Sequence, residues 1–194
     1  MSATIRTFIA FELPPAVIAL LRGVQQKLKR LDLRARWVRP ENIHLTLKFL
    51  GDIQPGDVDR IGVAMADAVS EVAPFSLAVK GLGVFPGIKR PRVIWVGIGG
   101  DTHALLALQN RLEKKLAPLG FPAEKRAFKA HLTLGRIKHA GNPEIIRQII
   151  NDLSDLNSED FILKQLILFK SDLKPSGAVY SYVKQAKLAK TNVD

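Results

Sequence analysis

Apolar residues recur along the chain with two different spacings, and these spacings predict its secondary structure. Alternation of apolar and polar residues, or a short apolar run bounded by turn residues, is typical of strands. We expect strands over residues 4–13, 36–38, 42–50, 75–79, 93–98, 130–137, 161–169 and 179–188. Apolar residues three and four positions apart predict helices over residues 16–31, 55–72, 102–119 and 143–153. Residues 81–87 contain three glycines and a proline and are expected to form a loop.

One tetrapeptide, His-Leu-Thr-Leu, occurs twice, as His44–Leu47 and as His131–Leu134. Both copies lie in predicted strands, where residues two positions apart point to the same face. Each copy therefore places an imidazole and a hydroxyl on one face, roughly 6–7 Å apart. The two leucines of each copy point to the opposite face, where a helix can cover them.

The repeat and the mixed order of elements predict an α+β fold of two pseudo-symmetric lobes. Each lobe is expected to be an antiparallel sheet with helices on its outer face, and the two lobes to face each other across a central cleft. No low-complexity linker divides the chain, so we expect residues 1–194 to form a single two-lobed domain with one motif in each lobe. The seam between the lobes is expected near Gly99 or Gly100.

The composition limits the kind of protein this can be. Of the 194 residues, 47% are hydrophobic, which allows a sizeable core. The chain has no cysteine, which excludes disulfides, thiolate zinc sites and a cysteine nucleophile. It shows no signal-peptide pattern and no apolar run of about 18 residues, so we expect a cytoplasmic protein that does not enter a membrane. The formal net charge of +11 favours polyanionic partners, nucleic acid first.

Two histidines that face each other across a cleft can perform acid–base catalysis, because imidazole titrates near neutral pH. In an in-line displacement at phosphorus, one would deprotonate the attacking group and the other would protonate the leaving group. Thr46 and Thr133 would donate hydrogen bonds to the phosphate oxygens. Neither motif brings a cysteine or carboxylate ligand, so we expect no metal and no cofactor. The alternative interpretation is that His44 and His131 only cap core strands through hydrogen bonds.

Two arginines near the second motif are further candidates for binding phosphate. Strict alternation would point Arg136 away from the cleft, but Gly135 permits a bulge that would redirect it. A solvated surface position is the alternative for Arg136, and the direction of Arg126 is open. In the first motif, Lys48 is expected to share the face of the histidine and the threonine if the strand continues regularly. We expect the large aromatic residues to lie in the core, with one of them available to stack on a base: Trp37, Phe49, Phe85 and Trp95.

The sequence resembles the two-histidine phosphoesterase superfamily and, within it, the RNA 2′,3′-cyclic phosphodiesterases, historically called bacterial 2′-5′ RNA ligases. The resemblance covers nearly the whole chain. It is carried by residues 6–14 (RTFIAFELP), 37–38 (WV) with 41–51 (ENIHLTLKFLG), 91–97 (PRVIWVG) and 126–134 (RAFKAHLTL). Ala127 and Ala130 stand where the family often has proline, a difference that concerns backbone stiffness rather than chemistry.

The resemblance implies metal-independent hydrolysis of an RNA 2′,3′-cyclic phosphate end to a 2′-phosphomonoester. His44 would donate a proton to the leaving 3′ oxygen and His131 would activate water, roles that the pseudo-symmetry alone leaves interchangeable. Thr46 and Thr133 would hold the phosphate, with Arg136 assisting. Family members also run the reaction backwards and join RNA ends in a 2′-5′ linkage. We expect a monomer, and two other functions stay open: a non-catalytic RNA-binding module, or a phosphodiesterase of a small cyclic nucleotide or a nucleotide sugar.

Overall fold

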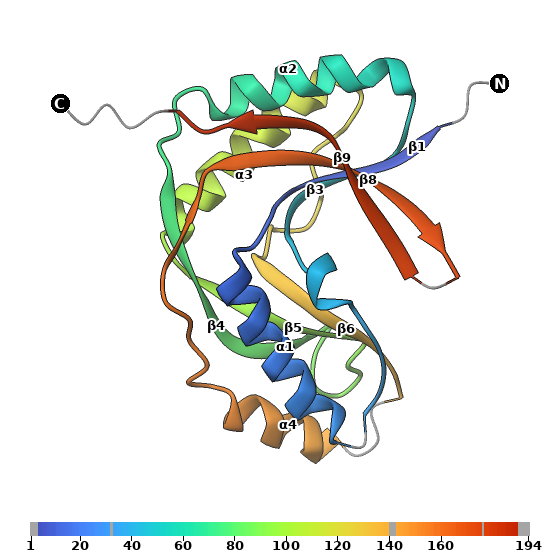
Figure 1. Cartoon of the computed structure of the whole chain (residues 1–194), viewed down its shortest axis with the longest axis vertical. Coiled ribbons are helices and arrows are strands. Elements are labelled where there is room, and N and C mark those ends of the chain that lie inside the picture. Colours follow the sequence, from blue (N-terminus) through green and yellow to red (C-terminus); the bar gives the residue numbers. More distant parts are fainter. Residues whose placement is uncertain (1–3, 32, 140–142, 176, 190–194) are drawn as a thin grey trace.

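Two antiparallel sheets make up the body of the protein (Figure 1). The computed structural model describes residues 4–31, 33–139, 143–175 and 177–189. The four-stranded sheet has the order β3-β1-β8-β9, formed by β1 (Ile5–Phe11), β3 (Leu45–Ile53), β8 (Gln165–Lys174) and β9 (Gly177–Lys187). The five-stranded sheet has the order β2-β6-β5-β4-β7, formed by β2 (Arg34–Trp37), β4 (Phe75–Phe85), β5 (Val93–Gly100), β6 (His131–His139) and β7 (Phe161–Leu163).

Within the described residues, four α-helices cover the two sheets: α1 (Pro15–Lys29), α2 (Val58–Val69), α3 (Thr102–Leu116) and α4 (Pro143–Asp152). Short 3₁₀ turns occur at Pro40–Asn42, Pro55–Asp57 and Ala117–Leu119. In Figure 1, α2 and α3 lie together over the four-stranded sheet, while α1 and α4 lie against the five-stranded sheet. This is the two-lobed α+β architecture that the sequence predicts.

The two lobes do not divide the sequence near Gly99 or Gly100 as expected. The first half of the chain gives β1 and β3 to the four-stranded sheet but β2 and β4 to the five-stranded sheet. The second half also contributes to both sheets, with β5, β6 and β7 in the five-stranded sheet and β8 and β9 in the four-stranded sheet. Helix α1, from the first half of the chain, also packs against a strand from the second half. Its Gln25 side chain donates 2.8 Å hydrogen bonds to the carbonyls of Val38 and of Leu134 on β6.

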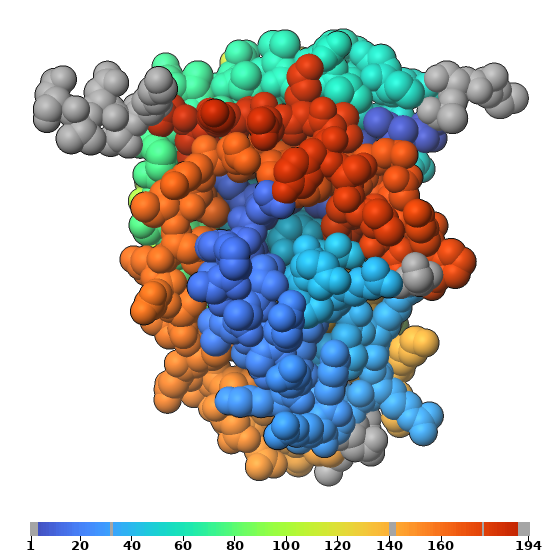
Figure 2. Space-filling model, viewed as in Figure 1, coloured from blue at the N-terminus to red at the C-terminus, as the bar shows by residue number. Residues whose placement is uncertain are grey.

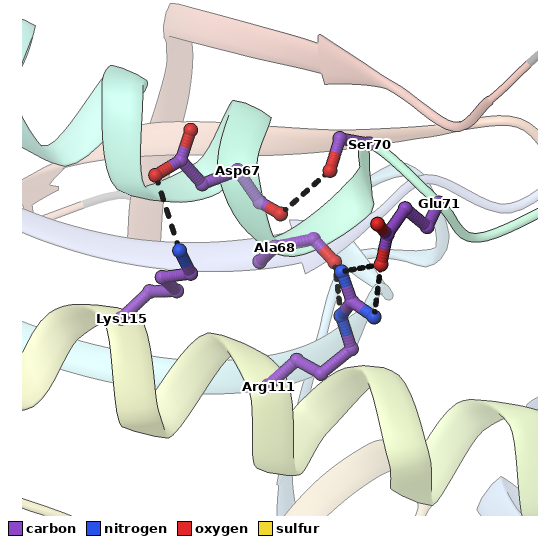
Figure 3. A network of polar contacts seen from close by, with 6 residues as sticks. All are labelled: Asp67, Ala68, Ser70, Glu71, Arg111 and Lys115. Carbon is purple, nitrogen blue, oxygen red and sulfur yellow. Dashed lines mark hydrogen bonds and ion pairs between the residues drawn. The ribbon is translucent and has the colours of Figure 1, made fainter.

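Helix α3 is joined by polar contacts to α2 and to the residues that follow α2 (Figure 3). The Arg111 guanidinium donates to the Ala68 carbonyl at 3.0 Å and, through both terminal nitrogens, to one Glu71 carboxylate oxygen at 3.1 Å. Lys115 Nζ lies 3.3 Å from Asp67. Exposed ion pairs of this kind contribute up to about 1 kcal/mol each. They link the two helices that cover the four-stranded sheet, on the face away from Thr46.

Two strand predictions are wrong in an informative way. Residues 81–87 were expected to be a loop, but β4 continues to Phe85, because Gly81 adopts a left-handed φ of +62° and forms a bulge between Lys80 and Leu82. Residues 161–169 were expected to be one strand, but the chain leaves the five-stranded sheet after Leu163 and enters the four-stranded sheet at Gln165. Apolar spacing alone does not report a change of sheet.

The four motif leucines lie in the main apolar core, as predicted: Leu45, Leu47, Leu132 and Leu134 are at most 3% exposed. A second, smaller apolar cluster lies on the other face of the four-stranded sheet and contains Phe8, Ala10, Ile167 and Phe169. This small cluster forms the floor beside the first histidine. Within the part of the chain that the structure describes, no helix is long and apolar enough to cross a membrane.

Candidate active site

The two histidines are held in the same way. His44 immediately precedes β3, and its Nδ1 lies 2.8 Å from the carbonyl oxygen of Asn42. His131 begins β6, and its Nδ1 lies 2.7 Å from the carbonyl oxygen of Lys129. A carbonyl oxygen only accepts hydrogen bonds, so Nδ1 carries the hydrogen in both rings. Each Nε2 is therefore left to exchange a proton with a ligand.

A bulge follows each threonine. On β3, Thr46 is opposite Ala10 and Lys48 is opposite Ile9, so Leu47 is the extra residue. On β6, Thr133 is opposite Trp95 and Gly135 is opposite Ile94, so Leu134 is the extra residue. A bulge of one residue reverses the alternation beyond it. The third residue after each threonine thus shares the threonine's face, and these residues are Phe49 on β3 and Arg136 on β6.

The bulges decide where the candidate cations lie. Arg136 is turned to the face of Thr133, by the kind of bulge that the sequence suggested, and its side chain is exposed. The expectation for Lys48 is wrong, because the bulge turns it to the helix side, where it is 4% exposed. There its Nζ lies 2.7 Å from Glu113 on α3 and donates a 2.6 Å hydrogen bond to the Pro122 carbonyl.

An aromatic pocket surrounds His44. Its ring stacks on Phe8 with 4.5 Å between centroids, and the ring of Tyr180 meets it edge-on at 5.2 Å. Phe169 lies 6.2 Å away. This apolar burial lowers the pKa of His44 to about 4, although the hydrogen bond to Asn42 opposes the shift. His44 is therefore neutral at pH 7 in the protein without ligand.

The surroundings of His131 are more open. Phe85 meets its ring edge-on at 5.0 Å and Trp95 at 6.2 Å. Trp95 lies over Gly83, where a Cβ atom would stand 2.4 Å from its ring. Opposite His131 on β5 is Gly97, which adds no side chain to this side of the sheet. One wall of the site is thus aromatic but leaves space next to the imidazole.

Residues of both lobes meet beside His44. Strands β3 and β6, which carry the two motifs, contact each other although they belong to different sheets. Burial raises the pKa of the Tyr180 phenol, and the positive charges of Arg136 and Arg6 oppose that shift. Arg136 of the five-stranded sheet therefore lies close to Tyr180 of the four-stranded sheet, which touches His44. The second motif strand is thus linked to the surroundings of His44 through Arg136 and Tyr180.

A family model described as LigT-like phosphoesterase matches residues 11–95 and 99–180, so that each matched segment contains one histidine–threonine pair. This chain belongs to the LigT-like phosphoesterase family. An RNA 2′,3′-cyclic phosphodiesterase of Methanothermobacter thermautotrophicus is 32% identical over 177 residues, which are 91% of this chain and 95% of the relative. The enzyme of the same name from Archaeoglobus fulgidus is 34% identical over 179 residues, 90% of this chain and 96% of its own length.

A solved member of the same fold supports the two-lobed architecture of this phosphoesterase. The crystal structure of TT0787 from Thermus thermophilus covers 96% of this chain and 100% of its own, with a TM-score of 0.78 and 26% sequence identity. The recognition of the family from the doubled motif and its flanking residues is confirmed.

Two hollows lie beside the first motif and its strand in this LigT-like phosphoesterase. One of about 490 Å³ lies beside His44 and is lined by α1, the Pro40–Asn42 turn and β9, including Tyr180 and Tyr182. In Figure 2 it opens between the blue residues of α1 and the red residues of β9. The other, of about 500 Å³, lies between β3 and residues 120–126 and includes Phe49 and Arg126. Arg126 is exposed and lines this hollow together with residues of the first motif strand.

The sequence did not point to several residues that the fold brings to the site. Phe8, Phe169 and Tyr180 surround His44, and Arg6 lies near Tyr180. Their strands are distant in sequence, and nothing in their local pattern shows which face they occupy. Of the aromatic residues considered for stacking, Phe49 is the one that is largely exposed, at 63%. Among the described residues, no three or more His, Asp or Glu side chains gather in a way that could hold a metal ion.

Proposed function

We propose that this protein hydrolyses the 2′,3′-cyclic phosphate at the end of an RNA to a 2′-phosphomonoester. The observation that carries the proposal is the pair of identical histidine–threonine motifs on contacting strands of the two lobes, each with its imidazole fixed through Nδ1. Family membership and relatives named RNA 2′,3′-cyclic phosphodiesterase support the same reaction. The proposal describes a cytoplasmic monomer that uses no metal or cofactor.

The two imidazoles divide the proton transfers. Nε2 of His131 takes a proton from water as the water oxygen bonds to phosphorus. On the opposite side the bond from phosphorus to the 3′ oxygen breaks, and Nε2 of His44 gives that oxygen a proton. The 2′ oxygen keeps its bond to phosphorus. General acid and general base catalysis each contribute roughly 10²–10⁴-fold to the rate.

The remaining residues of the site bind the phosphate. Thr46 and Thr133 share the faces of their histidines and donate hydrogen bonds to the non-bridging oxygens. Arg136 supplies positive charge and can bind two oxygens at once. Arg126, in the hollow with Phe49, holds the RNA at the side of the first motif. Reversal of the same steps, with a ribose hydroxyl as nucleophile, would join two RNA ends.

The low pKa of His44 fits the role of an acid only when substrate is bound. Free His44 is neutral, whereas a general acid must carry its proton. The negative charge of the cyclic phosphate favours the imidazolium form and raises the pKa of the ring, because opposite charges a few ångströms apart attract strongly in a dry site. Binding of substrate thus favours the uptake from solvent of the proton that His44 then gives to the leaving oxygen.

The decisive experiment is incubation with an RNA oligonucleotide ending in a 2′,3′-cyclic phosphate, with a chelator present. We expect a product whose phosphate is on the 2′ oxygen, identified by chromatography against both isomers. His44→Asn and His131→Asn should each lower kcat by at least 100-fold, whereas His103→Asn, an exposed residue on α3, should not. Near-normal turnover by either site variant, or activity lost with the chelator, would contradict the proposal.

A further inference from the structure

We propose that arginines on the neighbouring strands β2 and β6 form a binding track for the phosphates of the RNA strand that precedes the cyclic end. The arginine track consists of Arg34, Arg36 and Arg136. It extends the proposed function, on which it rests, because it selects a polynucleotide rather than a mononucleotide as substrate.

The strand register places the track on the catalytic face of the five-stranded sheet. Arg36 is directly opposite Arg136, and Arg34 is opposite His139. Arg136 shares the face of Thr133, so Arg36 faces the same way, and Arg34, two residues earlier, does too. Strand β2 is the outer strand of this sheet, and the side chains of Arg34 and Arg36 are exposed.

The alternate residues of β2 fix this orientation. Ala35 and Trp37 point to the opposite face and pack against the main core. Trp37 lies over Gly135, where a Cβ atom would stand 3.0 Å from its ring. A one-residue slip of β2 would expose Trp37 and bury two guanidinium groups. The arginines are therefore held on the cleft side by the packing of their neighbours.

The track gathers positive charge on one face of two neighbouring strands. Arg36 and Arg136 are directly opposite each other on neighbouring strands. Like charges in such positions repel each other and destabilise a sheet. Among the residues that the structure describes, no ion pair uses Arg34, Arg36 or Arg136. An anionic ligand would relieve the repulsion, and guanidinium groups bind phosphate in a bidentate manner.

The direction of the track shows which part of the ligand it would contact. It begins at Arg136, beside the catalytic threonine, and leads along β6 and β2 to Arg34 and His139. From Thr133 to His139 the strand extends for roughly 15–20 Å, which is beyond the reach of a single nucleotide. A strand whose cyclic end lies between His44 and His131 would place its preceding phosphates on the track. Because the track starts at the proposed site for the cyclic phosphate, we infer that its ligand is RNA and not an acidic protein.

The test compares kcat/KM for an eight-nucleotide RNA and a mononucleotide, both with a 2′,3′-cyclic phosphate, at low salt. We expect the wild-type protein to prefer the octamer by at least tenfold. The Arg34→Gln/Arg36→Gln double variant should lose most of this preference while its turnover of the mononucleotide stays within twofold. The matched control is Arg60→Gln/Lys114→Gln, which removes the same charge from exposed positions on α2 and α3.

Binding of an octamer that ends in a 2′-phosphate provides a measurement that does not need turnover. Loss of two phosphate contacts on single-stranded RNA should lower the slope of log affinity against log salt by about 1.4. An unchanged length preference or salt slope in the double variant would overturn the track. If the wild type turns over neither substrate but the double variant still binds the octamer more weakly, the track stands and the proposed reaction fails.

Discussion

The two copies of His-Leu-Thr-Leu have the same local structure but different surroundings. In both, Nδ1 bonds to the carbonyl two residues earlier, and a bulge follows the threonine. Beyond the bulge the copies differ. The first copy buries Lys48 against Glu113 and exposes Phe49, whereas the second places Gly135 under Trp37 and exposes Arg136. The shared tetrapeptide thus gives both motifs the same backbone geometry, whereas the residues packed around each motif determine its chemical properties.

The contrast is sharpest at the imidazoles. His44 lies between Phe8 and Tyr180, and its pKa is about 4, while His131 stands in a more open position beside Phe85. A histidine that is neutral until an anion arrives is suited to receive its proton together with the substrate. Two identical peptides can therefore serve as acid and base, because an asymmetric fold surrounds them.

The largest expected effect would separate acid from base. A substrate with sulfur in place of the 3′ oxygen has a leaving group that departs as a thiolate and needs little protonation. On the normal substrate, His44→Ala and His131→Ala should each lose roughly 10²–10⁴-fold in kcat. On the sulfur substrate, the kcat of His44→Ala should be within about tenfold of the wild-type value, while the kcat of His131→Ala should stay low. Recovery of His131→Ala instead would reverse the two roles.

The residues two positions after the threonines offer the next test. Lys48→Met would leave the buried Glu113 carboxylate without its partner, which costs about 3–5 kcal/mol of unfolding free energy. The corresponding change in the other copy, Gly135→Ala, should cost only about 1 kcal/mol, because Trp37 must shift by a few tenths of an ångström. Urea denaturation at pH 7 measures both values.

A double variant shows whether the ion pair is the cause. Lys48→Met/Glu113→Gln removes both charges and keeps an oxygen that can accept the hydrogen bond from Gln109. It should recover most of the lost stability. If the double variant unfolds as easily as Lys48→Met alone, the loss has another source, such as the missing hydrogen bond to Pro122.

The sequence predicted the motif faces but not all that follows them. Alternation placed His44 with Thr46 and the leucines in the core, because side-chain direction in a regular strand depends only on parity. It failed at Lys48, since a bulge depends on pairing with β1, which local pattern does not report. Gly135 gave a signal for the second bulge because glycine marks close backbone approach. The aromatic pocket of His44 could not be predicted from the sequence pattern, because Phe8 and Tyr180 come from opposite ends of the chain.

The residues three positions after the threonines should affect different parts of catalysis. Arg136→Gln should lower kcat/KM about 30–100-fold for every substrate, because a charge-assisted contact to phosphate contributes roughly 1.5–3 kcal/mol. Phe49→Ala should raise KM about tenfold only for substrates with a base, since stacking contributes roughly 1–3 kcal/mol per base. Methyl riboside 2′,3′-cyclic phosphate, which has no base, is the discriminating substrate. If Arg136→Gln and Phe49→Ala lose the same activity on this base-free substrate, the two positions do not differ in the way proposed.

The smallest effect concerns stability in acid. The folded-state pKa of His44 is about 4, below the value of about 6.5 in an unfolded chain. As pH falls from 7, the unfolded chain therefore binds this proton first, so the stabilising contribution is present above about pH 6.5 and is lost towards pH 4. Between pH 7 and pH 5 the loss should be about 2 kcal/mol. His44→Phe, which keeps a ring against Phe8, should remove this part of the pH dependence in urea denaturation. The control Thr46→Val removes no titratable group and should retain this pH dependence. A pH dependence that persists in His44→Phe would show that burial of the His44 imidazole is not what distinguishes the first motif.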